Sequence, residues 1–88
     1  MPRFIAVHPV ALKEADLKAL LARRDELPSS VTWRATFVAD EDHITYCEWD
    51  TPDERLLREI FEAFGVPYSE IHEVRVFEPA VELSGAAA

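Results

Sequence analysis

The sequence predicts an α+β domain of the ferredoxin-like type, with the order strand, helix, strand, strand, helix, strand. Two observations carry this prediction: apolar and polar residues alternate in the segments expected to be strands, and apolar residues recur every three to four positions between them. Right-handed crossovers then give one four-stranded antiparallel sheet, ordered fourth, first, third, second, with both helices on one face.

The first strand and the first helix are expected in the N-terminal third. The segment Arg3–His8 is short, apolar and partly alternating, as in a strand. From Leu12 to Arg24 the pattern becomes helical, and its apolar stripe consists of Leu17, Leu20 and Leu21.

A hairpin is expected in the middle of the chain. Alternation from Trp33 to Val38 predicts the second strand, with Trp33 and Phe37 on the same face. The acidic residues Asp40–Asp42 predict the turn, and the segment His43–Trp49 predicts the third strand.

The second helix has clear boundary signals. Thr51 and Glu54 form a capping-box pattern in which the threonine is the expected N-cap. Gly65 ends the helix and Pro67 prevents its continuation. The buried stripe is expected to contain Leu56, Leu57, Ile60, Phe61 and Phe64.

The fourth strand is expected over Ile71–Phe77. The chain of 88 residues is long enough for a single modest core, so residues 1–79 form one predicted domain. Residues 80–88 are expected to be a flexible tail.

Composition narrows the function classes. Nine basic against seventeen acidic residues give a net charge of −8, which disfavours nucleic acid and favours cations or basic partners. The sequence has no apolar run long enough to span a membrane, and its N-terminal stretch leads us to expect no signal peptide. The single cysteine cannot form an internal disulfide, so we expect a cytoplasmic protein.

The sheet face away from the helices is expected to be covered by a second copy of the chain. Large residues occur at both the odd and the even positions of the strands and therefore on both faces of the sheet. A solvated sheet face is normally polar. We therefore predict a homodimer with an α/β-barrel-like association of two sheets.

The stretch VTWRATFVADEDHITYCEWDTPDERLLREIFEAFGVPYSEIHEV, from Val31 to Val74, resembles the small ferredoxin-like nickel-binding proteins, a dimeric domain-of-unknown-function family. The resemblance implies a dimeric fold and nickel binding at the protein surface. Some family members carry a histidine in the second helix, where this chain has Ile60, so the resemblance does not supply the ligands. The matching residues are Trp33, Phe37, Tyr46, Cys47, Trp49, Gly65, Pro67, Ile71, Glu73 and Val74.

The predicted topology brings the three histidines to one edge of the sheet. His8 and His72 are expected to oppose each other in a register that also pairs Ala6 with Val74 and Phe4 with Val76, close enough to share an ion. A one-residue slip would place them on opposite faces. With His43 as a weaker ligand and Asp42 and Glu73 nearby, this predicts a site for nickel or another divalent transition metal.

Other readings remain open at the sequence level. The histidines could simply mark strand ends, and mid-strand Cys47 fits a packed, unreactive thiol. Without a phosphate loop or a nucleophile motif, the chain leans away from an enzyme. The alternatives are a small monooxygenase or isomerase with an aromatic pocket (Trp33, Tyr46 or Trp49, with His8 as the acid–base group), or a protein-interaction module.

Overall fold

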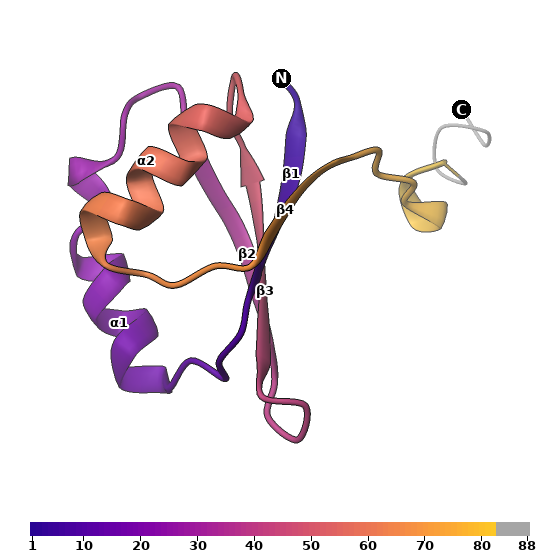
Figure 1. Cartoon of the computed structure of the whole chain (residues 1–88). Helices are drawn as coiled ribbons and strands as arrows, with labels where there is room; N and C mark the ends of the chain where they lie inside the picture. The colour runs from indigo at the N-terminus through magenta and orange to yellow at the C-terminus, as the bar shows by residue number, and fades with distance from the viewer. Residues whose placement is uncertain (83–88) are drawn as a thin grey trace.

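The computed structural model describes residues 1–82 and confirms the ferredoxin-like fold. One antiparallel sheet has the strand order β2-β3-β1-β4, as predicted, and both α-helices lie on the same face of it (Figure 1). The sheet is open in the single chain. The elements are β1 (Arg3–His8), α1 (Glu14–Ala22), the 3₁₀ turn η1 (Arg24–Glu26), β2 (Thr32–Ala39), β3 (Ile44–Asp50), α2 (Glu54–Phe64) and β4 (Glu70–Val74).

The hydrophobic core lies between the sheet and the helices. Helix α2 contributes Leu57, Ile60 and Phe61, which are all buried. Helix α1 contributes no buried residue, and its predicted stripe is wrong at Leu21, which is 49% exposed. Helix α1 therefore covers the sheet much more loosely than α2. Within residues 1–82, neither helix has the length and apolar character needed to cross a membrane.

The start of α2 differs by two residues from the capping-box prediction. The N-cap is Asp53, whose side chain accepts a hydrogen bond of 2.8 Å from the backbone nitrogen of Leu56. Thr51 is instead buried, and its hydroxyl donates to the Asp53 carbonyl. The predicted end is confirmed, because Gly65 has φ 69°, a left-handed conformation that suits glycine.

An irregularity in β2 moves one tryptophan to the other face of the sheet. Strand alternation predicts that Trp33 and Phe37 share a face, but the β2–β3 register shifts between Trp33 and Ala35. Trp33 therefore stacks on Trp49 on the helix-covered side, with ring centroids 5.8 Å apart. Phe37 lies opposite Tyr46, and both are exposed.

Strand β4 ends at Val74 rather than at Phe77. Arg3, the first residue of β1, already pairs with Val74, and the preceding residue, Pro2, has no backbone N–H to donate to a longer ladder. The predicted pairing of Phe4 with Val76 is therefore wrong, and Phe4 pairs with Glu73.

Residues 75–82 form an arm that leaves the sheet on the side away from the helices (Figure 1). The arm exposes Val76, Phe77 and Val81, and residues 79–82 form a helical turn. The predicted tail begins within this turn, and its last six residues lie outside the described part of the chain.

Candidate functional site

His8 lies in the interior, and the predicted histidine pair is not formed. In the observed register Ile5 pairs with His72, an odd shift of three residues from the prediction, so His8 and His72 face opposite sides of the sheet. The physical reason is that apolar Ile71 packs against the core opposite Ala6, which turns His72 outward. His8 is 0% exposed and its Nδ1 lies 2.7 Å from the Pro67 carbonyl oxygen.

On the sheet face away from the helices, here called the open face, His72 lies beside a carboxylate. The Nε2 atom of His72 is 3.1 Å from Oε1 of Glu70, and both side chains are more than half exposed. Two-residue spacing along β4 places both on the same face, so this partner could have been found from the sequence. An imidazole nitrogen and a carboxylate oxygen are both ligands that divalent transition metals accept.

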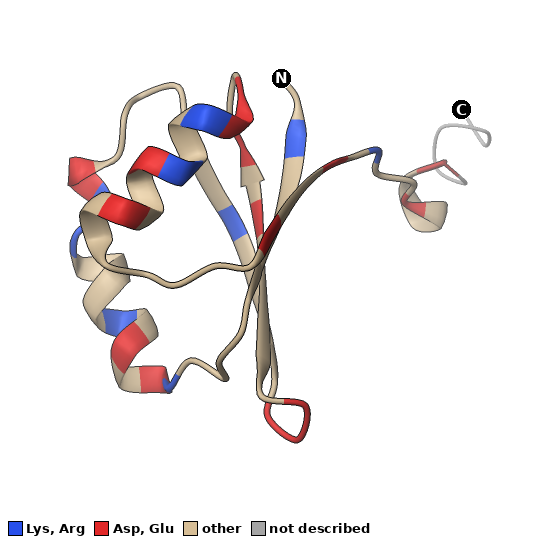
Figure 2. Ribbon diagram, in the orientation of Figure 1, with Lys and Arg blue, Asp and Glu red and all other residues tan. Residues whose placement is uncertain are grey.

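The other predicted ligands are dispersed. His43 and Asp42 lie in the exposed β2–β3 hairpin, whose acidic residues stand out in Figure 2. His43 has φ 56°, a left-handed conformation that closes the turn. Glu73 follows His72 directly on β4, so the two side chains face opposite sides of the sheet. Within residues 1–82, no three His, Cys, Asp or Glu side chains come together as a metal site, so this part of one chain offers at most a pair of ligands.

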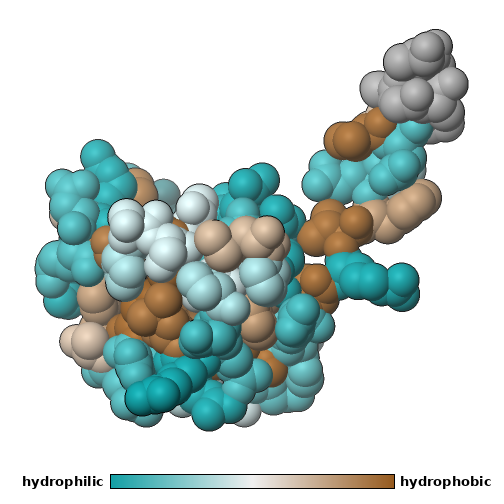
Figure 3. All heavy atoms as spheres, turned by 90° about the horizontal axis from the view of Figure 1, so that it is seen from above, coloured by the Kyte–Doolittle hydropathy of each residue, from teal (hydrophilic) through white to brown (hydrophobic). Residues whose placement is uncertain are grey.

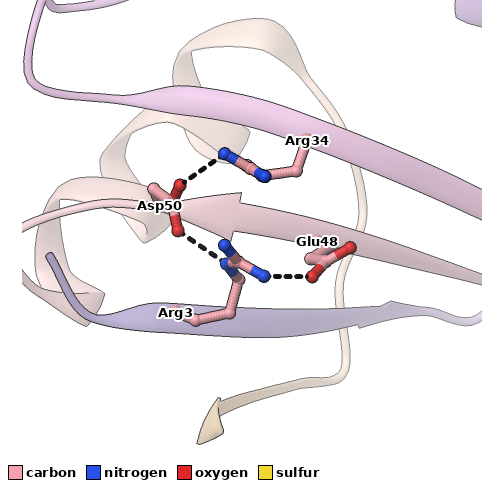
Figure 4. Close-up of polar contacts among 4 residues, drawn as sticks. All are labelled: Arg3, Arg34, Glu48 and Asp50. Carbon is pink, nitrogen blue, oxygen red and sulfur yellow. Dashed lines mark hydrogen bonds and ion pairs between the residues drawn. The ribbon is translucent and has the colours of Figure 1, made fainter. Parts of the chain in front are cut away.

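One end of the open face carries a network of ion pairs (Figure 4). The guanidinium of Arg3 reaches Glu48 and Asp50, each at 2.6 Å, and Arg34 reaches Asp50 at 3.2 Å. The hydrogen bond from Arg3 is the main reason that the pKa of Asp50 lies below its usual value. The network joins the ends of β1, β2 and β3, and its four charged side chains pair with one another.

The rest of the open face is mainly apolar. Phe37 is 56% exposed and Tyr46 is 38% exposed, although both lie on strands. Ile5, Val7 and Ile44 lie on the same side of the sheet and are half-buried. Hydrophobic surface is also visible on the body and along the arm when the molecule is seen from above (Figure 3). An exposed apolar face of this kind is typical of an interface.

Cys47 lies in the core on the helix-covered face. It is buried, and its sulfur lies 3.3 Å from the hydroxyl oxygen of Thr36. Burial raises the pKa of the thiol. Both properties oppose nucleophilic reactivity and agree with the expected packed thiol.

A small cavity of about 30 Å³ lies between α1, α2 and the sheet. Of the aromatic pocket considered as an alternative, Trp33, Trp49 and His8 are found here, whereas Tyr46 lies on the opposite face of the sheet. The remaining lining residues are Leu12, Leu17, Leu20, Leu27, Cys47, Ile60, Phe61, Phe64 and Val66.

Comparison with protein families gives a match over most of the chain. Residues 5–74 match the SCO4226-like family, described as nickel responsive protein SCO4226-like. The chain belongs to this family. The matched segment starts within β1 and ends with β4, so it contains the whole sheet and both helices but not the arm.

A solved structure agrees with the fold. SCO4226 from Streptomyces coelicolor A3(2) superposes with a TM-score of 0.68 at 22% sequence identity. The similarity covers 86% of this chain and 99% of the SCO4226 chain. A search of the curated proteins gives no match.

Proposed function

We propose that this protein is a small homodimer that binds nickel or another divalent transition metal through surface histidines and carboxylates. The observation that carries the proposal is the family match over residues 5–74, because the family is named for its response to nickel. The net charge of −8 supports it, since an acidic surface concentrates cations.

The favoured ligands are His72 and Glu70. They are already 3.1 Å apart, accessible, and held side by side on one strand. A pair of ligands does not fill the coordination shell of nickel, so water or a second copy has to supply the rest. In a two-fold dimer the same patch of both chains forms the interface, and a pair of ligands beside the two-fold axis meets its own equivalent. His72 and Glu70 in that place would give two imidazoles and two carboxylates from the two chains.

The β2–β3 hairpin is the second candidate for the metal. His43 and Asp42 are adjacent and exposed there, and the surrounding acids would attract a cation. Glu73, on the same edge strand as His72, remains a candidate only for a separate contact, because it faces the other way. His8 is shielded by the sheet and the helices and is not among the proposed ligands.

The homodimer is proposed because no part of residues 1–82 covers the apolar open face or the apolar arm. A second copy placed sheet to sheet would bury Phe37 and Tyr46 and produce the expected barrel-like association. We also infer a cytoplasmic location, since a lone free thiol fits a reducing compartment.

Nickel calorimetry on wild type and three variants tests the metal site. At pH 7.5, His72→Ala should lower the affinity at least tenfold, because it removes the only imidazole of the proposed pair. His43→Gly removes the hairpin ligand without straining a left-handed turn and should have a smaller effect. His8→Phe is the buried control and should bind as wild type does. If His72→Ala also binds as wild type, the proposed pair is not the site.

A further inference from the structure

His8 has a hydrogen-bonding atom that the fold does not use. A carbonyl oxygen can only accept, so the 2.7 Å contact with Pro67 places the ring proton on Nδ1. The neutral ring then has Nε2 as a bare acceptor. Burial also lowers the pKa of His8, which keeps the ring neutral. Within residues 1–82, no protein group donates to this Nε2 atom.

Trp49, which lines the interior cavity together with His8, has an unused donor. Its indole N–H is buried and has no hydrogen-bond partner in the described chain, whereas the N–H of Trp33 donates to Thr36 at 2.7 Å. Burial raises the pKa of Cys47, and an interaction with the Trp49 side chain partly offsets this. Sulfur is a weak acceptor, so this contact leaves the Trp49 N–H without a hydrogen bond.

Both unused groups belong to rings that contact one phenyl ring. Phe61 of α2 contacts the His8 ring at 5.0 Å and the Trp49 ring at 5.7 Å between centroids, both edge to face. The rest of the cavity wall is apolar, and among the described residues no charged side chain lines it. A guest at this place would therefore be uncharged and mostly apolar.

Of the elements that enclose the cavity, α1 can move most easily. None of its residues is buried, and it reaches the cavity through Leu17 and Leu20. The cavity of about 30 Å³ exceeds the space needed for one water molecule but is small for a ring, since an engineered cavity of about 150 Å³ holds benzene. A ring-sized guest thus requires a small outward shift of α1, which few packed side chains oppose.

We propose that the space between α1 and the sheet is a binding pocket for a small, uncharged, apolar molecule that carries a hydroxyl group, such as an alcohol or a phenol. The hydroxyl hydrogen donates to Nε2 of His8, and the apolar body lies among the leucines and Phe61. The Trp49 N–H supplies a second polar contact to an oxygen of the guest. The site lies on the opposite side of the sheet from His72 and is independent of metal binding.

The test compares phenol with benzene on the full, metal-free chain. Both are titrated while the ring nitrogen signals of His8 and the indole N–H signal of Trp49 are followed by NMR. Phenol should shift both signals along a saturating curve, and benzene should bind about tenfold more weakly, as expected for the loss of one hydrogen bond. Equal binding of the two, or binding of neither because the cavity takes only water, would overturn the proposal.

Two variants separate the hydrogen bond from the apolar pocket. His8→Phe keeps a ring in the wall but removes the acceptor, so it should bind benzene and lose the preference for phenol. Benzene binding serves here as the check that the variant is folded with an intact pocket. His72→Phe, on the outer face, should keep the wild-type preference. A preference for phenol that survives in His8→Phe also overturns the proposal.

Discussion

The buried histidine His8 makes the stability of the fold depend on pH. His8 is held neutral inside the protein, whereas in the unfolded chain its pKa returns to about 6.5. Above that pH both states are neutral and His8 adds no pH dependence. As the pH falls below about 6.5, the unfolded state takes up a proton that the folded state resists, so the folded state becomes less stable.

The prediction is that wild type loses stability between pH 7.5 and 5.5 and that His8→Phe loses less over the same interval. Urea unfolding followed by tryptophan fluorescence measures both. His43→Gly, which removes an exposed histidine from the hairpin, is the control and should follow the wild-type profile. Identical slopes for wild type and His8→Phe would show that His8 is not kept neutral by the fold.

Cys47 gives a second prediction at the residue scale. Because the thiol is buried and its pKa is raised, labelling by a thiol reagent should be slow in the native protein and fast in denaturant. Cys47→Ser should cost about 1 kcal/mol of stability, since it buries a more polar hydroxyl, and should leave nickel uptake unchanged. Fast native labelling would contradict the packed position of this thiol.

At the scale of elements, the two helices differ in the interactions that stabilise them. Helix α2 has a buried stripe, an N-cap and a glycine at its end, whereas α1 has no buried residue. Local opening should therefore begin at α1, which is also the movable wall of the interior cavity.

The capping assignment in α2 can be tested by substitution. Asp53→Ala should lower the free energy of unfolding by about 1 kcal/mol, because the backbone nitrogen of Leu56 loses its acceptor. Asp53→Asn keeps a side-chain oxygen and should retain most of the stability. Chemical denaturation measures both, and an equal loss in the two variants would argue against capping by the Asp53 oxygen.

At the scale of the whole molecule, the main question is what covers the open sheet face. Light scattering at micromolar concentration should give about twice the chain mass. Phe37→Glu places a charge in the apolar part of that face and should shift the protein to monomer. Leu21→Glu, at a similarly exposed apolar position on α1, is the matched control and should leave the mass unchanged.

The same experiment links assembly to the metal. If the second copy completes the shell around His72 and Glu70, the monomeric Phe37→Glu variant should bind nickel more weakly than the Leu21→Glu control. A wild-type chain that is monomeric at all concentrations would contradict the dimer and leave the open face for another partner.

The sequence by itself determined the order of the elements, the strand order of the sheet and the end of α2. These features follow from local signals: alternation, helical spacing, the acidic hairpin and Gly65 each act over a few residues. The right-handed crossover rule then leaves one arrangement of the sheet. The same local patterns carried the family resemblance that the match over residues 5–74 confirms.

Only the tertiary structure decided which side chains share a face. The shift between Trp33 and Ala35 moved Trp33 inward, and the packing of Ile71 against the core fixed a β1–β4 register that separates His8 from His72. Register is a competition among side chains distant in sequence, and one odd shift reverses every face assignment along a strand. The unused Nε2 atom of His8 depends on that same packing, because only folding places the Pro67 carbonyl beside its other ring nitrogen.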